Sequence, residues 1–258
     1  MKWLGMGEVS VYIHPTCMSS YRLVRGLNLK GLLGKVSLRN TSRGLDIMRE
    51  VVVSIPWITY RGTPAATDPV SVEEVESILA KGRVNVEQKP MELFVKAVQS
   101  SSFVASQVLL HRDVSIALNR HFIEAALRSR VGGPSPETIV HELRESSQEV
   151  YESIEPLLAR SLAYSYVREI MWARGLDSID PSSIARKELV GAWLMAKASL
   201  GRVFLPNKPI IAQHTGIESI VGLLLDRGEY IVKSVREEQE TIMGDTEYWR
   251  LLREYATI

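Results

Sequence analysis

The sequence is poorest in cysteine: Cys17 is the only one among 258 residues. A single cysteine excludes an internal disulfide and any metal site built from several thiolates. Neither positive nor negative charge is in excess, because 31 Lys and Arg residues nearly balance 30 Asp and Glu residues and give a net charge of +1. Since no basic run stands out either, we expect no nucleic-acid partner.

Long hydrophobic runs are missing as well. The two longest apolar stretches, around 189–205 and 217–225, are shorter than a membrane span once their charged residues are counted. These charged residues are Lys197, Arg202 and Glu218. Residues 1–10 contain Glu8 and lack the apolar segment of a signal peptide. With 45% hydrophobic and 24% charged residues, the composition is that of a globular protein, and we expect it to be cytoplasmic with no membrane partner.

The first third of the chain has regular strand and helix patterns. Apolar residues alternate over 8–14, which predicts a strand, and Pro15 ends it. An apolar face at helical spacing predicts a helix over 17–33 that stops at Gly34. Alternation predicts a short strand over 36–39. A helix should follow from Thr41 or Ser42 to about Val51.

Residues 54–82 predict a hairpin and one more helix. Pro56 precedes an alternating strand over 57–60, and Arg61–Gly62 is a turn signal before a returning strand over 65–67. Ser71, followed three residues later by Glu74, fits a capping box that starts a helix to about Ala80. Residues 1–82 therefore predict a β-α-β-α-β-β-α domain whose first two strands are parallel.

The remaining two thirds of the chain are dominated by helical spacing. Residues 83–90 are polar and predict a linker, and 91–258 show no convincing strand alternation. We expect helices over 91–110, 114–130, 135–156, 157–173, 180–200, 215–227, 229–243 and 246–255, with a loop at 206–209. The predicted fold class is thus an α/β domain followed by a larger all-α domain.

Cys17 falls at the start of a predicted helix. The unpaired N–H groups and the positive end of the helix dipole favour thiolate over thiol, so we expect a lowered pKa for Cys17. A thiolate is the form that attacks disulfides and electrophiles. On local sequence alone, a buried cysteine that acts as a small apolar residue is an equally simple interpretation. His14 lies three residues earlier. It could act as an activating base, although a neighbour of the site is the simpler interpretation.

The stretch VYIHPTCMSSYRLVRGL at 11–27 and the SIPWI segment at 54–58 together resemble the thioredoxin-like superfamily. The similarity is to glutaredoxins and to the N-terminal domains of glutathione transferases, whose layout also continues into an all-α domain. The resemblance implies that Cys17 is catalytic and that Pro56 is cis and lies against the sulfur. It also implies that the Ile55 backbone pairs with a thiol peptide in β fashion.

The same resemblance implies a substrate groove and a co-substrate. The predicted substrate-binding residues are Ser20, Tyr21, Ile55, Pro56, Thr67 and Asp68. The Thr67–Asp68–Pro69 turn would bind the γ-glutamyl end of glutathione, although Asp68 is equally well explained as a turn former. No bound cofactor is expected, only glutathione or another low-molecular-weight thiol as co-substrate. Electrophiles should bind between the domains, and the layout implies a homodimer.

One departure from the family pattern limits the chemistry. The motif is Cys17-Met18-Ser19-Ser20, so Ser20 stands where dithiol enzymes have a resolving cysteine. Turnover therefore needs an external thiol to resolve a mixed disulfide. Two hypotheses follow. The first is a thiol-dependent oxidoreductase or glutathione-transferase-like enzyme that acts on a small thiol or a protein disulfide. The second is a non-catalytic binding or assembly protein that keeps the fold.

Histidine and carboxylate pairs in the helical part allow a metal site as an alternative. Glu137 with His141, and His121 with Glu124, lie on common helix faces. A metal site would need matching ligands on a second helix. A solvated charged face explains these pairs more simply, and we expect no metal.

Overall fold

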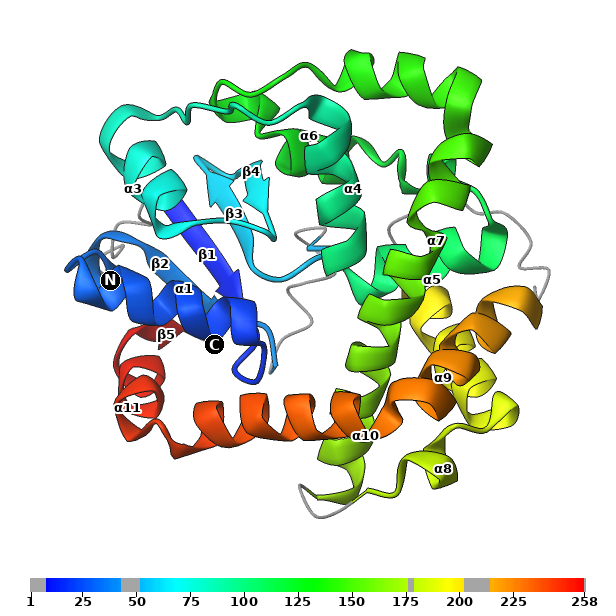
Figure 1. Cartoon of the computed structure of the whole chain (residues 1–258). Coiled ribbons are helices and arrows are strands. Elements are labelled where there is room, and N and C mark those ends of the chain that lie inside the picture. The colour runs from blue at the N-terminus through cyan, green and yellow to red at the C-terminus, as the bar shows by residue number, and fades with distance from the viewer. Residues whose placement is uncertain (1–7, 43–51, 176–178, 202–213, 258) are drawn as a thin grey trace. The chain divides into compact units, whose positions relative to one another are not determined.

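The computed structural model describes residues 8–42, 52–175, 179–201 and 214–257. The chain is a mixed α/β protein with a sheet near the N-terminus and a large helical part (Figure 1). This confirms the predicted combination of an α/β segment with a helical one. The predicted helix over 41–51 and the loop at 206–209 lie outside the described residues.

Contacts divide the chain into two units. The sheet unit comprises Met1–Ala97, Arg120–Val140 and Ile242–Ile258, and the helical unit comprises Val98–Asn119 and His141–Thr241. This division differs from the single boundary predicted at 83–90. The reason is that apolar residues distant in sequence, Val131, Ile242 and Tyr248, are buried in the core of the sheet unit. Local periodicity does not reveal such returns.

Within the described residues, five strands form one mixed sheet. They are β1 (Val9–Ile13), β2 (Ser37–Asn40), β3 (Trp57–Tyr60), β4 (Thr63–Thr67) and β5 (Ala256–Thr257). Their order is β4-β3-β1-β2-β5. β1 and β2 are parallel, whereas β1–β3 and β3–β4 are antiparallel. β5 pairs in parallel with β2, so a strand from the C-terminal end, which the sequence analysis did not predict, borders the sheet.

One face of this sheet packs against two helices of the same unit, α1 (Met18–Leu29) and α3 (Val72–Lys81) (Figure 1). The predicted capping box is present, since the Ser71 hydroxyl accepts from the Glu74 N–H at 3.1 Å and the Glu74 carboxylate accepts from the Ser71 N–H at 2.8 Å. α1 ends earlier than predicted because Gly31 adopts a left-handed φ of 65° that terminates helices.

The opposite face of the sheet is buried too. Tyr12, Trp57 and Thr67 on this face are almost inaccessible, and α6 (Arg120–Leu127) packs against β4. Phe94 of α4 (Pro90–Ser100) meets Phe122 edge-to-face, with ring centroids 6.1 Å apart. A sheet buried on both faces explains why β1 is buried at every position.

Several predicted helices have different bounds. The helix predicted over 91–110 is two helices, because Ser101 caps a second one, α5 (Ser102–His111). The segment 114–130 likewise divides into η2 (Val114–Ala117), α6 and η3 (Ser129–Val131). Conversely, α7 (Pro136–Arg174) runs through Pro156 and has a non-helical residue only at Ser146.

Among the described residues, the helical unit contains α5, η2, most of α7 and three further helices. These are α8 (Pro181–Ile184), α9 (Lys187–Gly201) and most of α10 (His214–Gly244), a helix that continues through Gly228 where the sequence predicts a break. α5 packs so closely on α9 that a side chain at Gly201 would collide with the Phe103 carbonyl. The amide of the fully buried Gln107 donates to the Ala198 carbonyl across this contact.

No single helix among the described residues is long and apolar enough to cross a membrane. By length and composition alone, the bent pair Pro90–Ser100 and Ser102–His111 passes that test.

Candidate functional site

Cys17 lies at the N-terminus of α1, as the sequence predicts. It is the N-cap residue, with φ −85° and ψ 124°, and its carbonyl accepts from the Tyr21 N–H at 2.9 Å. Its own N–H donates to the His14 carbonyl at 3.1 Å, which closes the turn between β1 and α1. The side chain is half-buried. The thiol is therefore held beside the first N–H groups of a twelve-residue helix.

The thiol faces the segment that precedes β3. The Cys17 sulfur lies 3.8 Å from the Ile55 carbonyl oxygen, to which the thiol donates. The Ile55–Pro56 peptide bond is cis, as predicted, and so is Asp68–Pro69. The structure thus brings Cys17 and the Ile55 backbone together across 38 residues of sequence.

Pro56 and Thr67 are joined by a hydrogen bond. The Pro56 carbonyl accepts from the Thr67 hydroxyl at 3.2 Å and from the Asp68 N–H at 3.1 Å. Both Pro56 and Thr67 are buried, and Thr67 is completely inaccessible. Asp68 is half-buried, and its carboxylate accepts from the Ser19 hydroxyl in the first turn of α1 at 3.2 Å. Asp68 is therefore brought to the same end of α1 as Cys17, whereas Thr67 has a structural position.

Ser20 and Tyr21 point to partners within the protein. Ser20 is fully buried, and its hydroxyl accepts from the His14 N–H at 3.2 Å, which ties the end of β1 to α1. The Tyr21 hydroxyl donates to the Asp245 carboxylate at 2.8 Å. The His14 ring is held locally, since its Nδ1 accepts from the Thr16 N–H at 3.3 Å.

Asp245 connects α1 to α11 (Thr246–Tyr255) within the sheet unit. One carboxylate oxygen caps α11 by accepting from the Tyr248 N–H at 2.9 Å, and the other lies 3.2 Å from Nε of Arg25. Burial alone would raise the pKa of Asp245, but the Tyr248 N–H, the Tyr21 hydroxyl and Arg25 outweigh it and lower this pKa. The pKa of Tyr21 is raised by burial and by its bond to the same carboxylate.

Replacing Asp245 by Asn should reduce stability at neutral pH by about 1 kcal/mol, because the amide keeps the cap but loses the charge that holds Arg25 and Tyr21. A carboxylate with a lowered folded-state pKa stabilises the fold above its unfolded value of about 3.9, and this contribution is lost as the pH falls through the folded pKa. Urea unfolding should therefore show a difference between wild type and Asp245→Asn that shrinks towards about pH 3.

The matched control for this prediction is Asp226→Asn. The Asp226 side chain is 74% exposed and contacts only its neighbour Arg227 among the ion pairs of the described residues. Its replacement should change stability by less than about 0.5 kcal/mol at any pH. A difference between Asp245→Asn and wild type that is independent of pH would contradict the assigned role of the charge.

The sequence analysis missed Arg128, which holds the Thr67–Pro69 turn in place. Arg128 lies between α6 and η3 at a left-handed φ of 57°, and it is 2% exposed. Its Nε donates to Glu74 at 2.9 Å, and its Nη2 donates to the Thr67 carbonyl at 3.3 Å and to the Pro69 carbonyl. No sequence pattern predicts this contact, because Arg128 and Thr67 are separated by 61 residues.

Tyr248 of α11 is a second residue that the sequence analysis missed. It is completely buried, and its hydroxyl donates to the Pro15 carbonyl at 3.0 Å, two residues before Cys17. The spacing of Tyr248 with Leu251 and Leu252 indicates a buried helix face but does not reveal what this face covers.

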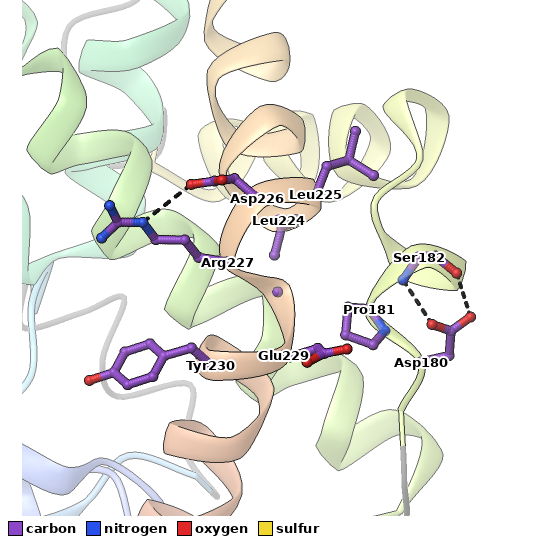
Figure 2. Close-up of a pocket in the computed structure, with 10 residues that line it drawn as sticks. Asp180, Pro181, Ser182, Leu224, Leu225, Asp226, Arg227, Glu229 and Tyr230 are labelled. Carbon is purple, nitrogen blue, oxygen red and sulfur yellow. Dashed lines mark hydrogen bonds and ion pairs between the residues drawn. The ribbon is translucent and has the colours of Figure 1, made fainter.

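A separate groove of about 520 Å³ lies in the helical unit between α8 and α10 (Figure 2). Pro181 packs against α10 so closely that a side chain at Gly228 would collide with it. Figure 2 shows that Arg227 and Tyr230 point away from Pro181. Arg227 pairs with Asp226 at 3.3 Å, and Asp180 caps α8 by accepting from the Ser182 N–H at 3.0 Å. Asp180, Asp226 and Arg227 are thus paired with their neighbours, and the residues that line this groove include no cysteine.

Within the described ranges, no group of three or more His, Cys, Asp or Glu residues is placed to hold a metal ion. Comparison of the chain with family models, with curated proteins and with solved structures finds no match.

Proposed function

We propose that residues 8–82 form a thioredoxin-like domain and that the chain is a monothiol thiol–disulfide oxidoreductase with Cys17 as its nucleophile. The observation that carries the proposal is the position of Cys17 at the N-terminus of α1, with its sulfur 3.8 Å from the Ile55 carbonyl. The strand order β4-β3-β1-β2, with β1 and β2 parallel and β3 antiparallel to β1, supports it.

The proposed reaction proceeds in two exchange steps. In the first, the Cys17 thiolate attacks one sulfur of a disulfide, forms a mixed disulfide and releases the other sulfur as a thiolate. In the second, a low-molecular-weight thiol such as glutathione attacks the mixed disulfide, restores Cys17 and leaves as a new disulfide. One half of the substrate leaves as a thiol, and the other half leaves joined to the external thiol as a disulfide that a second external thiol reduces, so the electrons balance without a bound cofactor.

The groups around the thiol suggest how a substrate would be seated. The Ile55 backbone would pair with an extended thiol peptide beside the sulfur, and the Asp68 carboxylate would attract a protonated amine such as that of glutathione. A reducing, cytoplasmic compartment would supply the external thiol that a single cysteine needs. If glutathione bound beside Cys17 and its own thiol attacked an electrophile, forming a thioether and releasing the leaving group of the electrophile, the same site would serve a glutathione-transferase-like reaction.

A second candidate function is a non-catalytic binding or assembly protein. It is favoured by the satisfied state of the predicted substrate-binding groups. The Pro56 carbonyl, the Asp68 carboxylate and the Tyr21 hydroxyl all have hydrogen-bond partners inside the protein. Ser20, at the position of a resolving cysteine, is fully buried and bonded to His14.

The pH dependence of Cys17 alkylation separates the two functions. The oxidoreductase requires a midpoint well below about 8.5, the ordinary value for a thiol. It also requires that glutathione disulfide add one glutathione to the protein and that reduced glutathione remove it, both followed by intact mass. Cys17→Ser is the blank for each measurement. A midpoint at or above the ordinary value, together with no mixed disulfide, would leave the binding protein as the function.

A further inference from the structure

Tyr248 reaches the turn that carries Cys17 from the opposite end of the chain. It belongs to α11, in the same unit as α1, and the two helices pack together near the ends of the sheet (Figure 1). The Tyr248 ring is completely buried and lies edge-to-face on Tyr21, with centroids 5.0 Å apart. Its hydroxyl donates to the Pro15 carbonyl at 3.0 Å.

The turn from His14 to Cys17 is held at both ends by local bonds. The Cys17 N–H donates to the His14 carbonyl, and the His14 N–H donates to Ser20. Thr16 bonds to the His14 ring within the turn, whereas the Tyr248 hydroxyl holds the Pro15 carbonyl from a distant helix. Because the Pro15 carbonyl is buried with Tyr248, loss of this donor would leave it without that bond and free the turn to move.

We infer that Tyr248 is a positioning residue for Cys17, so that the last helix of the chain fixes the thiol at the N-terminus of α1. The closeness of the two side chains also affects the pKa of the Tyr248 hydroxyl, which is raised first by burial and then by the charge of Cys17. The hydroxyl is consequently a hydrogen-bond donor over the whole range in which a thiol titrates. The inference rests on the proposed function only in taking Cys17 as the reactive group.

The other titratable groups around the thiol stay unchanged in the test below. They are on the turn after β1, on α1, on the turn after β4 and at the N-cap of α11, and they are His14, Tyr21, Arg25, Asp68 and Asp245.

The test is the pH profile of Cys17 alkylation by iodoacetamide in the full chain carrying Tyr248→Phe. This change keeps the ring and removes only the donor. A turn that drifts from the helix N-terminus stabilises the thiolate less, so the midpoint should rise by about 0.5 unit or more and the rate at neutral pH should fall at least roughly threefold. Tyr248→Met is a second loss variant with the same expectation, because a flexible thioether fills the space left by the ring.

Two control variants separate positioning from general loosening of α11. Trp249→Phe removes the bond from the Trp249 indole to the Ile242 carbonyl, 3.0 Å long, and keeps an aromatic ring at the position whose ring centroid lies 5.6 Å from that of Tyr248. Tyr255→Phe removes a hydroxyl from the far end of the same helix. Both should leave the midpoint at the wild-type value even if their thermal unfolding temperatures fall.

The outcomes also distinguish this inference from the proposed function. A wild-type midpoint well below that of an ordinary thiol, with an unchanged midpoint in Tyr248→Phe and Tyr248→Met, overturns the inference and leaves the oxidoreductase intact. A shift in both Tyr248 variants on a wild-type midpoint that is not lowered supports the inference while the proposed function fails. A shift of equal size in Trp249→Phe also overturns the inference, because the effect would then belong to the helix and not to the hydroxyl.

Discussion

Replacing Arg128 by Leu is expected to destabilise the protein by about 3 kcal/mol or more. The guanidinium is 2% exposed and donates to Glu74 and to the carbonyls of Thr67 and Pro69. The Glu74 side chain is 24% exposed, so solvent screens part of the ion pair and its loss alone is modest. Most of the cost comes from carbonyls that lose their donor, above all the buried ones of Thr67 and Ala126. Urea unfolding followed by circular dichroism measures it as a lower midpoint.

Two further variants make this result specific. Arg128→Lys keeps the positive charge but lacks the planar fork that bonds several acceptors at once, so it should fall between wild type and Leu. Arg120→Leu is the surface control. Its side chain is 76% exposed, and its partner Glu124 is also paired with Arg130 at 2.7 Å, so stability should change by less than about 0.5 kcal/mol. Equal losses for Arg120→Leu and Arg128→Leu would contradict the role assigned to the buried guanidinium.

Elements with strong local signals could be predicted from the sequence. The strand Trp57–Tyr60, the hairpin turn at Arg61–Gly62 and the helix Thr246–Tyr255 have the predicted bounds. Each is fixed by nearby residues: Arg61 and Gly62 both have positive φ, as tight hairpins require. β5 could not be predicted, because a two-residue strand has no periodicity and exists only through its pairing with β2.

The candidate site could be predicted only for residues close to Cys17 in sequence and for segments that match the pattern of a known family. The position of Cys17 at a helix start and the approach of Ile55 followed from such signals. Arg128 and Tyr248 did not, since each acts on a backbone carbonyl far away in sequence. A carbonyl is present at every residue, so no residue type at Pro15 or Pro69 reveals that a distant side chain will bind there.

Ser20→Cys should convert the single thiol into a pair that closes an intramolecular disulfide. Cys17 caps α1 and Ser20 is three residues on, in the first turn, where side chains at this spacing are neighbours. Such Cα atoms lie about 5–6 Å apart, which a disulfide can span. Oxidation with glutathione disulfide should therefore leave wild type with one added glutathione and the variant with only two hydrogens lost, as read by intact mass. The reduced variant should be less stable by about 1 kcal/mol, because sulfur is a weaker acceptor for the His14 N–H.

Ser19→Cys is the matched control for this conversion. Ser19 is the neighbouring residue, is half-buried and bonds to Asp68, but a side chain two residues from Cys17 on a helix does not face it. This variant should keep mixed disulfides with glutathione instead of resolving them internally. Accumulation of mixed disulfides on Ser20→Cys would show that the buried first turn of α1 prevents the two sulfurs from meeting. In that case the absence of a resolving cysteine would follow from the packing around Ser20, and the single thiol would be a property of the fold at this position.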